Sequence, residues 1–318
     1  MASSGNPLVA VVDCVPDDEP FLSELRAKAA TRISYGAPAP GEIAERARGA
    51  AVLATLYTYT RVDGAVLSRL PTLRLVATRT SGYSHIDAEA ARRRGVAVAT
   101  VPAASTQAVA EYVFGAVLAA QRRLVQARDA VRGGAWRYHD FRGFELAGAT
   151  LGVIGLGMIG TRVAELGHAL GMHVLAWSRT PRELAGVELA ELMQVMARAD
   201  IVSVNLALTG ETRGLIGERE LAKLKPSAWL VNTARGGIVD EDALFASLES
   251  GRPGGAVLDV LAEEPPSAER LERMSTVPNL LVTPHIAWNT EQAIRRQFDE
   301  LTENVLAFLE GRPRNLIE

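Results

Sequence analysis

Three residues that could act together on a carbonyl group follow predicted strands in the second half of the sequence. Arg235 lies in VNTARGGIVD, Glu264 in LDVLAEEPP and His285 in VTPHIAW. The carboxyl ends of parallel strands face one crevice, so the three side chains can converge there. An arginine can bind a carboxylate and polarise the adjacent carbonyl, a histidine can protonate the carbonyl oxygen, and a glutamate can orient the imidazole and raise its affinity for a proton. The set predicts reduction of a 2-oxo acid, whereas each residue taken alone could be a structural loop residue.

A glycine-rich turn follows the strand near the middle of the chain. The segment LGVIGLGMIG, residues 151–160, places Gly155, Gly157 and Gly160 at a characteristic spacing. The first glycine permits a tight turn, the second lets the backbone approach a pyrophosphate, and the third lets the next helix pack closely on the strand. Free N–H groups at the start of that helix favour anions. With a further strand expected at residues 173–177, the pattern predicts a βαβ unit that binds a dinucleotide.

The end of that further strand bears on the choice of dinucleotide. A site for NAD usually places a carboxylate about 20 residues beyond the turn, where it binds the ribose 2′-hydroxyl. Here the strand is followed by Ser178, Arg179 and Thr180, and the first carboxylate is Glu183. Arg179 can pair with a 2′-phosphate, and the two hydroxyl groups can donate to it. We therefore expect NADP(H) to be favoured; in the alternative, NAD(H) binds and Arg179 is a solvated loop residue.

Strand and helix patterns alternate along the whole chain, which predicts an α/β fold with parallel sheets. Strands are expected at residues 8–12, 51–56, 73–78, 96–100, 151–154, 173–177, 201–205, 229–232, 255–258 and 280–283. Helices are expected at residues 21–30, 87–94, 106–124, 161–170 and 290–309, with a loop-rich segment at 132–148. The central glycine turn and the late helix predict a dinucleotide-binding domain, residues 102–285, inserted into a discontinuous substrate domain, residues 1–101 and 286–318. Because ligands collect at domain interfaces, the active site is expected between the two domains.

Composition limits the classes of function. A chain of 318 residues suits two domains, and 48% hydrophobic residues provide for buried cores. A formal net charge of −3 gives no electrostatic footprint for nucleic acid or an anionic membrane. The lone cysteine, Cys14, suits a reducing compartment. The first residues lack the basic region and apolar run of a signal peptide, and no apolar run is long enough to span a membrane, so we expect a cytoplasmic protein.

The motifs, taken in order, resemble those of the D-isomer-specific 2-hydroxyacid dehydrogenases. The matching segments are SGYSHID (81–87), VPAASTQAVAE (101–111), GLGMIG (155–160), NTARGGIVDEDAL (232–244), LDVLAEEP (258–265) and PHIAW (284–288). The resemblance implies two Rossmann-like domains, the outer one flavodoxin-like, an NAD(P)-dependent dehydrogenase, and a homodimer. It also implies that Arg235, Glu264 and His285 form the catalytic trio.

The resemblance further assigns binding residues. The substrate carboxylate would be held by backbone amides of the loop Ser81, Gly82 and Tyr83, and the other expected substrate contacts are Arg235, Trp288 and Tyr57. The expected cofactor contacts are Thr106, Gly155, Gly157, Met158, Ile159, Gly160, Ser178, Arg179, Thr180, Leu206, Ala207, Thr212, Thr233, Ala234, Arg235, Asp259 and His285. Alternatively, Trp288 is a core tryptophan, and Tyr57 or Tyr59 is a surface residue of its loop.

The sequence also departs from the family pattern near the adenosine end of the cofactor. Where the family often has a histidine, one further residue and a proline, this chain has Asn205, Leu206 and Ala207. Ser178 replaces the family's NAD-selecting aspartate, in agreement with NADP(H). The segment 180–191 is short, so we expect a thinner cover over the adenine.

The identity of the substrate stays open between several classes. Members with this pattern include glyoxylate/hydroxypyruvate reductases and D-lactate-type dehydrogenases, all acting on small 2-oxo acids. A dehydrogenase for a phosphonate-type anion would need additional cations, for which Arg61 is the nearby residue. A dinucleotide-sensing, co-repressor-like binding protein would carry tails beyond the fold, and the compact chain disfavours it.

Overall fold

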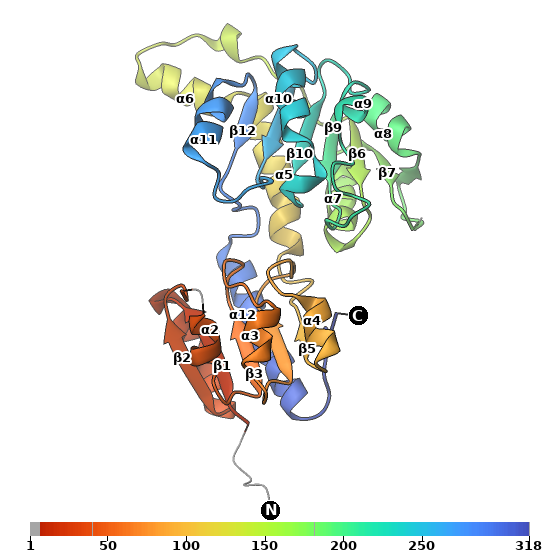
Figure 1. The fold of residues 1–318 in the computed structure, drawn as a ribbon. Coiled ribbons are helices and arrows are strands. Elements are labelled where there is room, and N and C mark those ends of the chain that lie inside the picture. The colour runs from red at the N-terminus through yellow and green to blue at the C-terminus, as the bar shows by residue number, and fades with distance from the viewer. Residues whose placement is uncertain (1–6, 40, 181, 318) are drawn as a thin grey trace, which may run out of the picture. The chain divides into compact units, whose positions relative to one another are not determined.

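The computed structural model describes residues 7–39, 41–180 and 182–317, and the chain divides into two compact units. The first unit contains Met1–Ser105 and Thr290–Glu318, and the second contains Thr106–Asn289. Each unit has its own parallel sheet (Figure 1). Each also has its own hydrophobic core. The predicted class of two parallel α/β domains, one of them discontinuous, is confirmed.

The first unit is built on a five-stranded parallel sheet with the order β2-β1-β3-β4-β5. Its strands are β1 (Val9–Cys14), β2 (Thr31–Tyr35), β3 (Val52–Thr55), β4 (Leu75–Thr78) and β5 (Ala97–Ala99). Its helices are the 3₁₀ helix η1 (Pro16–Leu22), α1 (Ser23–Lys28), α2 (Glu42–Arg46), α3 (Gly64–Ser68), α4 (Ala88–Arg93) and α12 (Glu291–Leu309). The strand order is that of flavodoxin-like folds. The late helix α12 completes this unit, because Phe298, Leu301 and Val305 are buried against the apolar side chains of β1, β3 and β4.

The second unit contains a seven-stranded parallel sheet with the order β12-β11-β10-β9-β6-β7-β8. Its strands are β6 (Thr150–Ile154), β7 (His173–Trp177), β8 (Val187–Leu189), β9 (Ile201–Val204), β10 (Trp229–Asn232), β11 (Gly255–Leu258) and β12 (Leu280–Val282). Its helices are α5 (Thr106–Gln121), α6 (Leu124–Arg132), η2 (Tyr138–Phe141), α7 (Met158–Ala169), α8 (Leu192–Arg198), α9 (Glu218–Leu221), η3 (Gly236–Ile238), α10 (Glu241–Glu249) and α11 (Ala268–Thr276). Strand order reverses at β6, which pairs with β7 on one side and β9 on the other. Ligands of doubly wound sheets bind outside the carboxyl ends of the strands at such a reversal.

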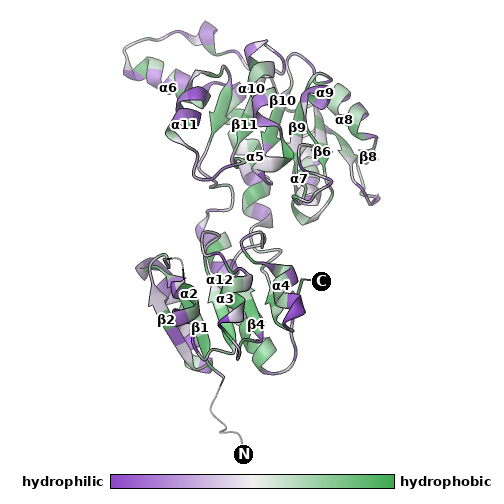
Figure 2. Ribbon diagram, viewed as in Figure 1, coloured by the Kyte–Doolittle hydropathy of each residue, from purple (hydrophilic) through white to green (hydrophobic). Residues whose placement is uncertain are grey.

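The strands in the middle of each sheet are the most apolar elements. In β3, β4, β9, β10 and β11 every residue is buried, and Figure 2 shows hydrophobic residues concentrated along the strands of each unit. Helices cover both faces of a parallel sheet, so its strands are apolar on both sides. Among the described residues, no helix is long and apolar enough to cross a membrane.

The structure corrects the prediction for residues 106–148. The single helix expected at 106–124 ends at Gln121, and Arg123 has a left-handed backbone with φ of 53°. A second helix, α6, then begins at Leu124. None of its residues is buried, and its apolar side chains Leu124, Val125 and Val131 are exposed.

Candidate active site

The three glycines after β6 have different structural roles. Gly155 has a φ of +98°, and its N–H donates to the carbonyl of Trp177 at the end of β7 over 2.7 Å. A Cβ on Gly160 would lie 1.8 Å from the carbonyl oxygen of Gly155, whereas a Cβ on Gly157 would meet no atom within 4 Å. Gly155 and Gly160 are therefore required by the protein's own packing, and Gly157 leaves open space at the start of α7.

The start of α7 fits a pyrophosphate group. Gly157 and Met158 are exposed. The Thr161 N–H donates to the Gly157 carbonyl at the start of α7, and among the described residues the N–H groups of Met158 and Ile159 have no acceptor. Such N–H groups, together with the helix dipole, bind anions. This geometry fits the dinucleotide predicted from the sequence.

Two polar side chains at neighbouring strand ends are also unsatisfied within the described part of the chain. The Asn205 Oδ1 atom follows β9 and the Thr233 Oγ1 atom follows β10, and neither has a hydrogen-bond partner there. The Thr106 Oγ1 atom at the start of α5 is likewise buried without a hydrogen-bond partner among the described residues. Two of these three residues, Thr106 and Thr233, are among the expected cofactor contacts.

Arg179 occupies the loop after β7, as expected, but the structure pairs it with an unexpected residue. Its guanidinium lies 2.8 Å from the carboxylate of Glu211, in the loop after β9, and both side chains are about three-quarters exposed at 75% and 76%. Ser178 is half-buried and Thr180 exposed beside it. Leu206 packs near Gly155, where a Cβ on the glycine would approach its side chain to 2.8 Å.

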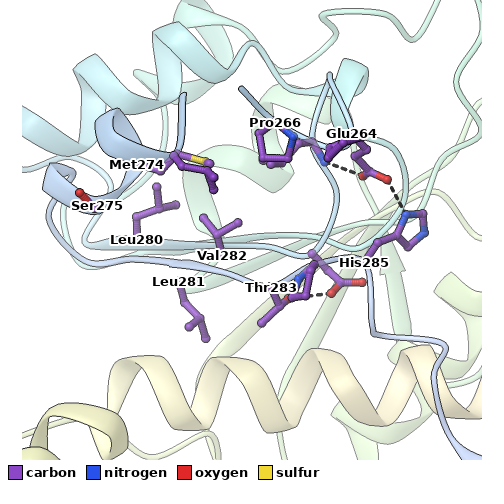
Figure 3. Close-up of a pocket in the computed structure, with 14 residues that line it drawn as sticks. Glu264, Pro266, Met274, Ser275, Leu280, Leu281, Val282, Thr283 and His285 are labelled. Carbon is purple, nitrogen blue, oxygen red and sulfur yellow. Dashed lines mark hydrogen bonds and ion pairs between the residues drawn. The ribbon is translucent and has the colours of Figure 1, made fainter. Parts of the chain in front are cut away.

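His285 and Glu264 form a close pair in the second unit. The His285 Nδ1 atom lies 2.7 Å from Glu264 Oε2, and the other carboxylate oxygen accepts the N–H of Leu261 over 2.8 Å (Figure 3). With Nδ1 engaged, Nε2 is the ring nitrogen available to a substrate. The two side chains are 34% and 38% exposed, so solvent and small molecules can reach them.

Arg235 lies close enough to act on the same pair electrostatically. Burial alone would raise the pKa of Glu264, but the hydrogen bond from His285, the N–H of Leu261 and the charges of His285 and Arg235 together lower it below its ordinary value. Burial lowers the pKa of the Arg235 guanidinium, and the charge of Glu264 works against that effect. An arginine nevertheless stays charged in proteins. The second unit thus holds an ionised carboxylate, an imidazole and a fixed cation in one place.

A close backbone approach brings the loops of Arg235 and Glu264 together. A Cβ on Gly236 would lie 1.9 Å from the backbone carbon of Leu261, so only glycine fits between the two loops. The buried carboxylate of Glu241 accepts the N–H of Ala262 and pairs with Arg270 over 2.6 Å. The absence of a side chain at Gly236 therefore serves the packing of these two loops.

Asp259 fixes the turn that carries His285. Its carboxylate is buried and accepts the hydroxyl of Thr283 over 2.6 Å and the N–H groups of Ile286 and Ala287 over 2.8 Å each. These bonds hold His285 in a left-handed conformation, with φ of 54°, that non-glycine residues rarely adopt. The expected cofactor contact at Asp259 stays a prediction, because its side chain is occupied with the protein itself.

Tyr112 extends this network and was not identified from the sequence. Its hydroxyl hydrogen-bonds Thr283 Oγ1, which in turn donates to Asp259. Tyr112 lies on α5, 171 positions before Thr283. Burial raises the pKa of this phenol, so it stays protonated and can donate. A lone tyrosine in the apolar helix was the only available signal.

A cavity of about 650 Å³ lies beside the His285–Glu264 pair in the second unit. Its walls are mainly apolar, and Figure 3 shows its lining residues with the hydrogen-bonded pair at one end. The lining residues include Leu261, Pro266, Leu271, Met274, Leu280 and Val282.

In the first unit, the loop after β4 presents free backbone donors. Among the described residues, the N–H groups of Ser81, Gly82 and Tyr83 have no acceptor. The loop is braced from within, since the Thr80 hydroxyl donates to the Gly82 carbonyl over 2.7 Å and the Ser81 hydroxyl donates to the Val101 carbonyl over 3.0 Å. Consecutive free N–H groups form a site suited to a carboxylate.

Tyr57 is held by its neighbours in the first unit. Its hydroxyl donates to Asp18 over 2.9 Å, and the Arg79 guanidinium lies 4.7 Å from its ring centroid. Tyr59 stacks on it with ring centroids 5.1 Å apart and is 52% exposed. Tyr59 therefore offers the more accessible ring of this loop. The predicted substrate contacts of Tyr57 and of the half-buried Trp288 stay predictions.

Comparisons with known proteins agree with this geometry. Residues 114–287 match the model of the D-isomer specific 2-hydroxyacid dehydrogenase NAD binding domain. The chain is 38% identical over 285 residues to a glycerate dehydrogenase of Methylorubrum extorquens, covering 88% of this chain and 89% of that protein. It is 41% identical over 295 residues to a glyoxylate reductase of Aeropyrum pernix, covering 89% and 87%. A structure of an acyclic imino acid reductase in complex with NADPH and D-Arg superposes with a TM-score of 0.90 at 27% identity, covering 98% of this chain and all of that one.

The chain belongs to the D-isomer specific 2-hydroxyacid dehydrogenase family, as the sequence motifs predicted. It is an oxidoreductase that uses a nicotinamide dinucleotide.

Proposed function

We propose that the protein reduces a small 2-oxo acid of the glyoxylate, hydroxypyruvate or pyruvate type to the D-2-hydroxy acid. The observation that carries the proposal is the 2.7 Å pair of His285 and Glu264, which shares one unit with Arg235 and the glycine turn. Similarity to a glycerate dehydrogenase and a glyoxylate reductase supports a substrate of this size.

Each residue has a defined part in the proposed reaction. The bound dinucleotide supplies the hydride. Arg235 binds and polarises the 2-oxo acid, His285 donates a proton from Nε2 to the carbonyl oxygen, and Glu264 stabilises the imidazolium through Nδ1. The free amides of residues 81–83 hold the substrate carboxylate. Trp288 and Tyr57 remain proposed contacts to the rest of the substrate.

A panel of glyoxylate, hydroxypyruvate and pyruvate, read by loss of NAD(P)H absorbance, tests the proposal. We expect turnover of at least one of these acids, and a loss of about 10²–10⁴-fold in His285→Ala. His173→Ala is the matched control. His173 begins β7, at the end of the sheet away from the carboxyl ends of the strands, so this variant should behave as wild type. Oxidation of a phosphonate-type anion, or cofactor binding without turnover of any 2-oxo acid, would overturn the assignment.

We also propose that NADPH is the favoured cofactor, because the end of β7 carries Ser178, Arg179 and Thr180 in place of a carboxylate. A 2′-phosphate would pair with the Arg179 guanidinium. Arg179→Ala should weaken NADPH binding by about 1.5–3 kcal/mol and leave NADH almost unchanged. Equal losses for both cofactors, measured as dissociation constants by fluorescence titration, would contradict the preference.

Four broader assignments complete the proposal. The segment 102–285 is the dinucleotide-binding domain, and residues 1–101 with 286–318 are the substrate domain.

The protein is a homodimer, supported by the exposed apolar side chains that follow α5, among them Trp136 at 84% exposure and Tyr138 at 74%. It works in the cytoplasm, in line with its lone, buried Cys14. It binds no nucleic acid, in line with its net charge of −3. Light scattering after size-exclusion chromatography tests the dimer.

A further inference from the structure

The ion pair of Arg179 and Glu211 joins two loops that flank the dinucleotide turn. Arg179 follows β7, and Glu211 lies in the loop after β9. Both strands pair with β6, one on each side, and the glycine turn follows β6 directly. The bridge therefore connects the two sides of the place where the adenosine end of a dinucleotide is expected.

The loop that carries Glu211 is braced by its own threonines. The Thr209 N–H donates to Thr212 Oγ1 over 2.8 Å, and the same hydroxyl donates to the Ala207 carbonyl over 2.7 Å. The Arg213 N–H donates to the Thr209 carbonyl over 3.0 Å. Glu211 thus projects from a hydrogen-bonded turn. The residues directly after β7 include no carboxylate, but Glu211, in the loop after β9, places one beside Arg179.

We propose that Glu211 is a specificity-determining residue that opposes NADPH by competing with the 2′-phosphate for Arg179. The inference rests on the proposed role of Arg179 and goes beyond it by assigning the residue that limits the preference. To bind the phosphate, the guanidinium must give up or share its 2.8 Å contact with the carboxylate. NADH makes no such demand, because its ribose hydroxyl carries no charge.

The size of the effect follows from the exposure of the pair. Exposed ion pairs are weak, with interaction energies that correspond to about 1.5- to 5-fold in an equilibrium constant. Removing the negative charge of Glu211 should therefore tighten NADPH by about that factor. The gain should shrink at high salt, because the charges are exposed to solvent.

Calorimetric titration with adenosine 2′,5′-bisphosphate and with 5′-AMP tests the inference without turnover. We expect Glu211→Gln to tighten the bisphosphate about 1.5- to 5-fold and to leave 5′-AMP unchanged. Glu188→Gln is the matched control, since it removes a carboxylate from another exposed pair of the same unit, with Arg198 at 2.6 Å. That control should change neither affinity. An unchanged bisphosphate affinity in Glu211→Gln, or an equal gain for both ligands, would overturn the inference.

The double variant separates competition from simple repulsion. In an Arg179→Ala background, Glu211→Gln should not increase the affinity for the bisphosphate further, because the guanidinium for which Glu211 and the phosphate compete is absent. A gain that persists there overturns competition. The two proposals fail differently. If Arg179→Ala leaves the bisphosphate affinity unchanged, the NADPH preference is wrong. If Arg179→Ala weakens it and Glu211→Gln has no effect, the role of Glu211 alone is wrong.

Discussion

At the scale of single residues, the site depends on how the protein holds one imidazole. Glu264 fixes Nδ1, and Asp259 fixes the backbone of the turn, so His285 is constrained at both its ring and its main chain. The position of the Nε2 edge of the ring is thereby set by the protein itself. Such preorganisation reduces the cost of reaching the reactive geometry.

Glu264→Gln should move the alkaline limb of the pH–rate profile for reduction to lower pH. The lowered pKa of Glu264 keeps the carboxylate ionised at neutral pH, where it stabilises the protonated imidazole. Reduction needs that proton, so once the charge is removed, activity should fall earlier as the pH rises. The measurement is kcat/KM from pH 5 to 10, with Glu263→Gln as the neighbouring control. Identical profiles for wild type and Glu264→Gln would show that the carboxylate does not act on the imidazole.

The three residues proposed as a catalytic trio could be singled out from sequence because each follows a strand end in a distinctive local motif. Tyr112 and Glu211 could not, because their roles depend on contacts between distant segments. Tyr112 reaches Thr283 across 171 positions, and Glu211 meets Arg179 across 32. Local spacing carries no information about such pairings. Only the strand order, which places β9 and β7 beside β6, brings the second pair together.

At the scale of elements, the turn after β6 combines a packing requirement with a binding requirement. Gly160 is buried against the Gly155 carbonyl, and Gly157 is exposed beside open space. Replacing Gly160 by alanine should therefore affect mainly the stability of the fold, whereas replacing Gly157 by alanine should affect mainly cofactor binding.

Gly160→Ala should destabilise the protein by more than about 2 kcal/mol, because the new methyl group overlaps a backbone carbonyl. Gly157→Ala should cost less than about 1 kcal/mol, as an alanine at a helix N-cap, yet should weaken cofactor binding at least about tenfold by filling the space for the pyrophosphate. Urea unfolding and fluorescence titration measure the two effects. Wild-type cofactor affinity in Gly157→Ala would contradict the proposed pyrophosphate position.

Central elements were predicted better than edge elements, for a physical reason. The strands β10 and β11 were predicted to the residue, because both of their faces are covered and the sequence is continuously apolar. The edge strands β2 and β8 were missed, since TRISY and VEL are partly exposed and contain charged residues. Charges on edge strands also discourage pairing with other chains.

At the scale of the whole molecule, the first unit depends on a helix from the other end of the chain. Phe298 of α12 is fully buried and stacks on Phe21 with ring centroids 4.9 Å apart, and the Arg79 guanidinium lies 4.8 Å from its ring. The core of this unit thus combines residues from both segments. A substitution in this core therefore changes the packing of the first unit directly.

Phe298→Ala should destabilise the first unit by about 3–5 kcal/mol, the usual cost of removing a buried phenylalanine side chain. All four tryptophans, at positions 136, 177, 229 and 288, lie in the second unit, so their fluorescence reports on that unit alone. We expect circular dichroism to show an earlier unfolding transition that leaves the fluorescence transition and 5′-AMP binding unchanged. Asp299→Ala, on the exposed side of the same helix, is the control. A parallel shift of both signals would contradict independent units.

The return of α12 to the first sheet has a consequence for synthesis on the ribosome. The second unit is one continuous segment, so it can fold as soon as it is made, whereas the first must wait for residues 291–309. Translation at about 5–20 residues per second leaves one apolar side of the sheet of β1, β3 and β4 without its helix for roughly 10–40 s. During that interval the nascent chain exposes surface that favours aggregation or chaperone binding. The first unit, although its strands are made before the second unit, is therefore the later of the two to complete its fold.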